Sequence, residues 1–495
     1  MNKTPVGGRG LGSVPLTRRR GVSELDVLEE QFAALATAAN RAEWPDPSVD
    51  AEYGVLEMGR SVENLDAFRA DLDIRHRIEA LQEIGSQLHT VDRRRLQLLR
   101  LNLDEPIEGA LANRLNSIER EILSSGPSPI GAAIAEDSRE LIRRSHLIRE
   151  LAAARNDFAR ALGHSNYLVL LWRRAEMGAR GPGAVLASAE QETRREYFMR
   201  KRILDQQLAR RPGSDPLALR REDYKGTRPR SELQPKTERD RRVADATSAF
   251  ERLGFPNLHQ ASLYWGEAQA NIHQTGAYTK SIDRLGDVRI WMSGTAGSSQ
   301  DRVLAHEFAH AAYDLASLEA PSYLLRVAPH PCLSEGLAQM IEWCSRSWEW
   351  KEAFPAQTPR ASISDCMRVR DLSSTRQLLV RATIERELYR RPDADLDACG
   401  VMATERFRGI LDDHAPKGQW ASATLASKPL NAFSYLIGRR ICGQLFHVLR
   451  NASGGWKDFT KVGASLLPLM RQGAIQPWEE ALACWIRKAL PTCTN

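Results

Sequence analysis

Apolar residues recur at three- and four-residue steps over long stretches of this chain, and that spacing restricts its fold more than any other feature. The steps are clearest near the start of the chain, at Leu25, Leu28, Phe32 and Leu35. They recur at Leu96, Leu99 and Leu103. Residues three and four apart share one face of an α-helix, so each run marks a buried helical face. We therefore expect a mostly α fold.

The chain divides by composition into four regions. Residues 1–22 hold five glycines, two prolines and three consecutive arginines without apolar periodicity, which indicates a flexible basic tail. Residues 23–209 follow the helical pattern and form an N-terminal helical region. Residues 210–242 are rich in proline, glycine and charge, which is typical of an exposed connection or insertion. The main boundary is predicted there, before a C-terminal region at residues 243–495.

One segment departs from the helical spacing. Residues 273–294 contain short runs rich in Tyr, Val, Ile and Trp, set off by turn residues at Gly276 and Gly286. This composition is typical of a small hairpin or an edge strand. Long helices are predicted to follow at residues 299–316 and 332–349.

The first of these helices contains His306, Glu307 and His310 in an HExxH pattern. Because residues four apart lie on one face of a helix, the two imidazoles can bind one Zn²⁺ ion. Glu307 would then lie beside the metal, where it can act on a water molecule. The alternative interpretation is a solvated helix face that carries these residues by chance.

A catalytic zinc ion takes a third protein ligand and keeps a fourth position open. Glu335 follows His310 by 25 residues (335 − 310), enough for one helix to end and a second to run back past the metal. Gln339 and Glu342, one and two turns further on, could orient the imidazoles. The alternative for Glu335 is a carboxylate placed near a helix N-terminus by the helix dipole. Cys332 and His330 also lie near Glu335, where both could simply pack the loop.

Composition limits the partners and the location. Lys plus Arg number 69 against 63 for Asp plus Glu, and this small excess over 495 residues gives no support to nucleic-acid binding. No run approaches the 18 or so apolar residues that a membrane span needs, and the N-terminus has no secretory signal. Seven irregularly spaced cysteines fit reduced thiols. A cytoplasmic location without membrane contact is expected, and the sequence leaves the oligomeric state open.

Residues 287–343, DVRI through HEFAH to the LLR segment and Glu335, resemble the peptidyl-dipeptidase A (angiotensin-converting enzyme-like) zinc metallopeptidases. The run from Glu335 to Glu342 also resembles thimet oligopeptidase and oligopeptidase F. Weaker similarity at residues 155–167 and 434–438 extends the resemblance to about residues 140–490. The resemblance implies a two-lobed helical metallopeptidase with a deep central cleft and a small β element beside the zinc helix.

The resemblance also implies roles for individual residues. One Zn²⁺ ion would be bound by His306, His310 and Glu335, with Glu307 as the general base. Tyr435 would stabilise the oxyanion of the tetrahedral intermediate, although a buried core tyrosine is the alternative. The edge strand that pairs with the substrate backbone would include Gly276, Ala277 and Tyr278.

The function predicted from these residues is zinc-dependent hydrolysis of short peptides, of the oligopeptidase or peptidyl-dipeptidase type. The chain departs from the converting-enzyme pattern at residues 423–432, which contain no His or Tyr, and Lys428, Arg439 and Arg440 are nearby cations without an assigned role. The missing residues leave open a specialised amide hydrolase that acts on one modified peptide or a non-peptide substrate in a biosynthetic pathway. A non-catalytic peptide-binding relative is a second alternative, and a nucleic-acid binder that uses its arginine-rich segments is a third.

Overall fold

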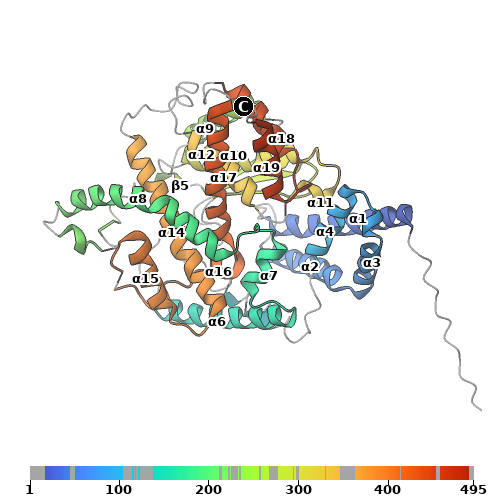
Figure 1. Cartoon of the computed structure of the whole chain (residues 1–495), viewed down its shortest axis with the longest axis horizontal. Coiled ribbons are helices and arrows are strands. Elements are labelled where there is room, and N and C mark those ends of the chain that lie inside the picture. Colours follow the sequence, from blue (N-terminus) through green and yellow to red (C-terminus); the bar gives the residue numbers. More distant parts are fainter. Residues whose placement is uncertain are drawn as a thin grey trace, which may run out of the picture. The chain divides into compact units, whose positions relative to one another are not determined.

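The structure is a computed structural model of the whole chain. The residues that it describes are 17–44, 51–103, 114–115, 117–118, 121–122, 138–210, 215–220, 223–224, 232–233, 236–255, 258–266, 277–293, 295–296, 300–328, 331–345, 363–412, 414–452 and 458–489. The chain forms two compact units, Met1–Asp104 and Glu105–Asn495. The predicted mostly α fold is confirmed in both (Figure 1).

The first unit contains α1 (Arg18–Glu43), α2 (Ala51–Ala70), α3 (Leu72–Glu83), a 3-10 turn η1 (Gly85–Gln87) and α4 (Thr90–Leu101). Helix α1 packs against the other three helices, and its Leu25, Leu28 and Phe32 side chains are buried at the three- and four-residue spacing seen in the sequence. Because α1 begins at Arg18, the last residues of the predicted tail are helical.

In the second unit, several helices precede the three-stranded sheet. These are α6 (Ser138–Ala161), α7 (Tyr167–Arg174), α8 (Pro182–Ala209) and α9 (Lys236–Arg252), with 3-10 turns η2 (Pro216–Ala218) and η4 (Leu258–Gln260). The later helices are α10 (Gln300–Ser317), α11 (Tyr323–Arg326), α12 (Cys332–Cys344), α14 (Ile363–Arg390), α15 (Leu396–Arg408), α16 (Ala423–Ser427), α17 (Asn431–Ala452), α18 (Phe459–Met470) and α19 (Trp478–Ala489).

The core of this unit is centred on three helices. Helix α12 packs against α10 on one side and against α17 on another, while α17 also contacts α14, α8 and α19. Their apolar faces belong to one continuous cluster of buried side chains. Figure 1 shows α17 as a long helix beside α12. Burial of this cluster holds the polar side chains of the three helices in fixed positions.

A small sheet of three strands lies against α10, which confirms the predicted β element beside this helix. Its strands are β2 (Ser262–Gly266), β4 (Val288–Ser293) and β3 (Ala277–Ser281), in the order β2-β4-β3. Strands β3 and β4 are antiparallel, with Thr279 opposite Ile290. Strand β2, which the sequence analysis did not identify, pairs with β4 in parallel. Two further short strands, β1 (Glu232–Leu233) and β5 (Thr295–Ala296), pair with each other.

The predicted connection at residues 210–242 contains η2, β1 and the first residues of α9 where the structure describes it. The four regions assigned from composition stay a prediction. Within the described residues, none of the helices combines the length and the apolar character that crossing a bilayer requires.

Candidate metal centre

The centre is built on α10, where His306 and His310 lie one turn apart on the same face and Glu307 directly follows His306. The surrounding residues of this helix are mainly Ala, Leu and Phe, and most of them are buried. His306 and Glu307 are buried with them. Such polar side chains stay in a core only where they have polar partners or a ligand, because burying them alone is unfavourable.

The third ligand candidate comes from α12. Glu335 lies in the first turn of that helix and is buried. Its carboxylate oxygens lie 3.5 Å from His306 Nε2 and 3.8 Å from His310 Nε2. The two Nε2 atoms are 3.1 Å apart. One ligand atom from each residue lies within 4.8 Å of the others, so the three residues form a group that could hold a metal ion.

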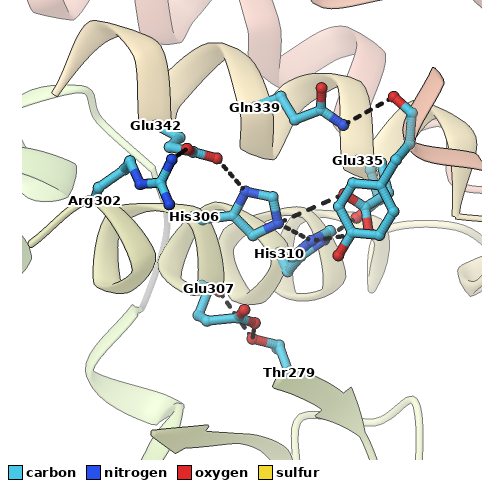
Figure 2. Close-up of polar contacts among 10 residues, drawn as sticks. Thr279, Arg302, His306, Glu307, His310, Glu335, Gln339 and Glu342 are labelled. Carbon is cyan, nitrogen blue, oxygen red and sulfur yellow. Dashed lines mark hydrogen bonds and ion pairs between the residues drawn. The ribbon is translucent and has the colours of Figure 1, made fainter. Parts of the chain in front are cut away.

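Contacts at the far ring nitrogens orient both imidazoles. His306 Nδ1 lies 3.0 Å from a carboxylate oxygen of Glu342, whose other oxygen pairs with Arg302 Nη1 at 3.0 Å. His310 Nδ1 lies 2.5 Å from the hydroxyl oxygen of Ser334. Figure 2 shows Glu342 and Arg302 on one side of His306, with Glu335 and His310 on the other. A carboxylate accepts a hydrogen from Nδ1, and that leaves Nε2 as the electron-pair donor.

The charges at the site favour a cation. Burial lowers the pKa of His310 to about 4, so its ring is neutral. Burial also acts to lower the pKa of His306, but the carboxylates of Glu335 and Glu342 outweigh it and raise that pKa to about 10, so that without a metal ion the ring carries a second proton. A bound metal ion would displace that proton from Nε2. Although burial opposes ionisation of Glu335, the two histidines lower its pKa.

The donor set matches a small divalent ion such as Zn²⁺. Within the described residues, Glu335 Oε2 is buried without a hydrogen-bond partner. An ion between the three side chains would satisfy this oxygen and both Nε2 atoms. Two imidazole nitrogens and one carboxylate oxygen are a usual ligand set for a catalytic zinc ion. His306, His310 and Glu335 therefore fit the metal that the sequence predicts.

The side chain of Glu307 turns toward the sheet, yet it stays close enough to His306 and Glu335 for their charges to act on it. Figure 2 shows its side chain turned to Thr279 of β3, whose hydroxyl lies 2.8 Å from Glu307 Oε2. Burial raises the pKa of Glu307 to about 7, although the charge of His306 and the Thr279 hydroxyl act to lower it. A carboxyl group with a pKa near neutrality can both accept and return a proton.

Helix α17 brings Tyr435 to the same place. Gln339 Nε2 donates a hydrogen bond to the backbone oxygen of Tyr435 at 3.3 Å. Burial raises the pKa of the Tyr435 hydroxyl well above its usual range, and the negative charges of Glu335 and Glu307 add to this effect. Tyr435 is thus a neutral hydrogen-bond donor beside the metal-ligand candidates.

The other predicted residues have the following places, where the structure describes them. Ala277 and Tyr278 belong to β3, an edge strand of the sheet, whereas Gly276 and His330 lie outside the described residues. Cys332 is buried, with its sulfur 3.8 Å from that of Met177. Lys428 is exposed, and Arg440 Nη1 lies 3.4 Å from the Ser188 hydroxyl. Arg439 is partly buried.

Comparison with known proteins shows the fold. The structure of Trypanosoma cruzi metallocarboxypeptidase 1 superposes with a TM-score of 0.68 at 15% sequence identity, over 94% of this chain and 96% of that one. No protein family and no curated protein matches the chain by sequence. The fold of this chain is therefore that of a known metallopeptidase structure along nearly its whole length.

Three residues of the site were missed in the sequence. Thr279 contacts Glu307, Ser334 contacts His310, and Arg302 pairs with Glu342. Ser334 and Arg302 could have been found from the sequence, because each lies within four residues of a predicted site residue on the same helix. Thr279 directly follows the predicted Tyr278, but no pattern in the sequence indicates its contact with Glu307, which depends on how β3 packs against α10.

Proposed function

We propose that this protein is a zinc-dependent metallopeptidase that hydrolyses peptide bonds in short peptides. The observation that carries the proposal is the convergence of His306, His310 and Glu335 beside the carboxyl group of Glu307. We place the chain among the relatives of the converting-enzyme-like and thimet oligopeptidase groups. The shared metallopeptidase fold supports this placement.

The residues divide the reaction between them. A zinc ion bound by His306, His310 and Glu335 would supply a Lewis acid that polarises the scissile carbonyl and lowers the pKa of water toward about 7. Glu307 accepts a proton from the attacking water and passes it to the leaving nitrogen, because an amide leaves only when its nitrogen is protonated. Tyr435 donates a hydrogen bond to the carbonyl oxygen as negative charge develops there.

Peptide capture is assigned to β3. The strand lies at the edge of its sheet, and an extended peptide can add to a sheet edge through backbone hydrogen bonds. Ala277 and Tyr278 would contribute to this edge, together with Gly276. Such pairing recognises the peptide backbone rather than its side chains, so it suits peptides of varied sequence.

The products of digestion identify the type of cleavage. Oligopeptidase or peptidyl-dipeptidase action would give internal fragments or dipeptides, and the name of the T. cruzi structure adds release of single C-terminal residues as an action to test. Mass spectrometry of a digested ten-residue peptide distinguishes these three actions.

The segment at residues 423–432, without His or Tyr, favours one further candidate, an amide hydrolase specialised for one modified substrate. Bound zinc with no turnover of a broad peptide library would support that candidate.

Glu307→Gln tests the proposed mechanism. The change keeps the size of the side chain but removes its basicity, so we expect peptide hydrolysis to fall by at least about 10²- to 10⁴-fold. Zinc content, measured by mass spectrometry of the folded protein, should stay near that of the wild type. A fully active Glu307→Gln protein would rule out Glu307 as the base.

A further inference from the structure

The side chain of Thr279 points from β3 toward α10. Successive residues of a strand face opposite sides of its sheet, so Ala277, Thr279 and Ser281 share one side. Thr279 lies opposite Ile290 of β4, which is buried in the same apolar cluster as Phe308 of α10. Tyr278, opposite Trp291, lies on the other side of the sheet.

The Thr279 hydroxyl makes two contacts with the same glutamate. Its oxygen lies 2.8 Å from Glu307 Oε2 and 3.0 Å from the backbone oxygen of Glu307. A hydroxyl has one hydrogen to donate and lone pairs with which to accept. It can therefore serve only one of these two oxygens as a donor at a time.

Whichever oxygen receives the hydrogen, the hydroxyl lies between the side chain and the backbone of Glu307. The backbone contact keeps Thr279 against this turn of α10, and the side-chain contact fixes the direction of the Glu307 carboxyl group.

We propose that Thr279 is a positioning residue that holds the Glu307 carboxyl group in the one orientation that this structure shows. The inference rests on the proposed function, in which Glu307 is the general base. Within the described residues, no other group makes a hydrogen bond to the Glu307 carboxylate. Glutamate has three rotatable side-chain bonds, so loss of this contact frees the carboxyl group to leave the orientation that proton transfer needs.

Thr279→Val tests this role because valine keeps the branched shape that suits a strand and removes the hydroxyl. We expect kcat on a short peptide to fall about 10- to 100-fold, with KM changed less than about twofold. Thr279→Ser restores the hydroxyl and should recover kcat to within about threefold of the wild type. The control is Thr247→Val in α9, where a threonine hydroxyl donates to the backbone oxygen of Val243 in its own helix at 2.9 Å. It should leave kcat unchanged.

Crystal structures of the metal-free variants give a readout that does not depend on activity. In Thr279→Val the Glu307 carboxyl group should leave its wild-type position or lose order, and in Thr279→Ser it should keep that position. An unmoved, ordered Glu307 in Thr279→Val would overturn the inference, as would a wild-type kcat or a purely KM effect. If the wild type hydrolyses no peptide, the proposed function fails, but the position of Glu307 still decides the role of Thr279.

Discussion

Each imidazole of the centre offers its Nε2 atom because a neighbour occupies Nδ1. For His306 that neighbour is Glu342, itself paired with Arg302. For His310 it is Ser334. Partners of this kind fix the ring orientation and raise the basicity of the nitrogen that binds the metal. Zinc affinity is therefore expected to depend on residues that do not touch the ion.

Glu342→Ala should weaken zinc binding about 10- to 100-fold, because His306 loses the acceptor that orients its ring. Competition with a chromogenic chelator measures the affinity of the purified protein. Glu319→Ala is the matched control, since it also removes a carboxylate paired with an arginine, at 2.8 Å from Arg471, but outside the centre. Equal zinc affinities in Glu342→Ala and the control would contradict the proposed role of Glu342.

For individual residues, the sequence predicts the metal-ligand candidates but not all of the side chains that contact them. Spacing singled out His306, His310 and Glu335, and the structure brings their ligand atoms together, while their binding of zinc stays a prediction. Four-residue spacing is a local property of a helix, so the histidine pair can be recognised from the sequence alone. Thr279 is 28 residues from Glu307, and their contact depends on strand register and on how the sheet packs against α10.

At the scale of elements, two glycines allow α12 and α17 to lie close together. A Cβ atom on Gly438 would lie 2.8 Å from Gln339 Nε2, 3.0 Å from Glu335 Cβ and 3.2 Å from the Glu335 backbone carbon. One on Gly336 would lie 2.5 Å from a side-chain carbon of Ile441. The close packing of these helices sets the distance between Glu335 and Tyr435. The glycines therefore position the site as well as the core.

Gly438→Ala should force α17 away from Glu335 and lower the free energy of unfolding by about 1–3 kcal/mol, the usual effect of overpacking. Zinc affinity and peptide hydrolysis should fall with it. Gly443→Ala, on the same helix, meets nothing within 4 Å and should be neutral or stabilise by up to about 1 kcal/mol. Thermal unfolding and zinc titration of both variants measure the difference. Equal behaviour of the two variants would show that helix proximity does not position Glu335.

The predicted elements match the observed ones most closely where the periodicity is strong. The helix predicted at residues 299–316 is α10, Gln300–Ser317, and the predicted hairpin is the β3–β4 pair. Strand β2 was missed because its parallel pairing with β4 joins segments separated in sequence. Parallel strands have no local turn signal that could reveal them.

In the whole molecule, the fold depends on the pattern of apolar and polar residues more than on which residues these are. It matches a known structure although only 15% of the aligned residues are identical. Helical periodicity identified which faces are buried. It could not identify which helices share a core, so the compact unit at Met1–Asp104 was not foreseen from the sequence. That information lies in tertiary packing, which a single sequence does not reveal.

Stability should depend on pH through buried carboxyl groups such as Glu385 of α14, which accepts a hydrogen bond from the Leu430 backbone N–H at 2.6 Å. Burial raises the pKa of Glu385 to about 7, against the opposing effects of that bond and of Arg155. Between about pH 4.3 and 7 the folded chain keeps a proton that the unfolded chain has lost. The free energy of unfolding should therefore fall as pH rises through this range and level off above it.

Glu385→Gln removes this titration and keeps an acceptor for Leu430. Relative to the wild type, the variant should gain about 1–3 kcal/mol of stability between pH 5 and pH 8. Urea unfolding at the two pH values measures the change. Glu150→Gln, at an exposed carboxylate, should show no such gain. A pH-independent difference between Glu385→Gln and the wild type would contradict a raised pKa.

X-ray diffraction at the zinc absorption edge, from crystals of the full chain supplied with zinc, tests the metal centre most directly. One anomalous peak is expected about 2.0–2.2 Å from His306 Nε2, His310 Nε2 and a Glu335 carboxylate oxygen. No peak between these residues, or a Glu335 side chain turned away from both histidines, would contradict the proposed metallopeptidase site.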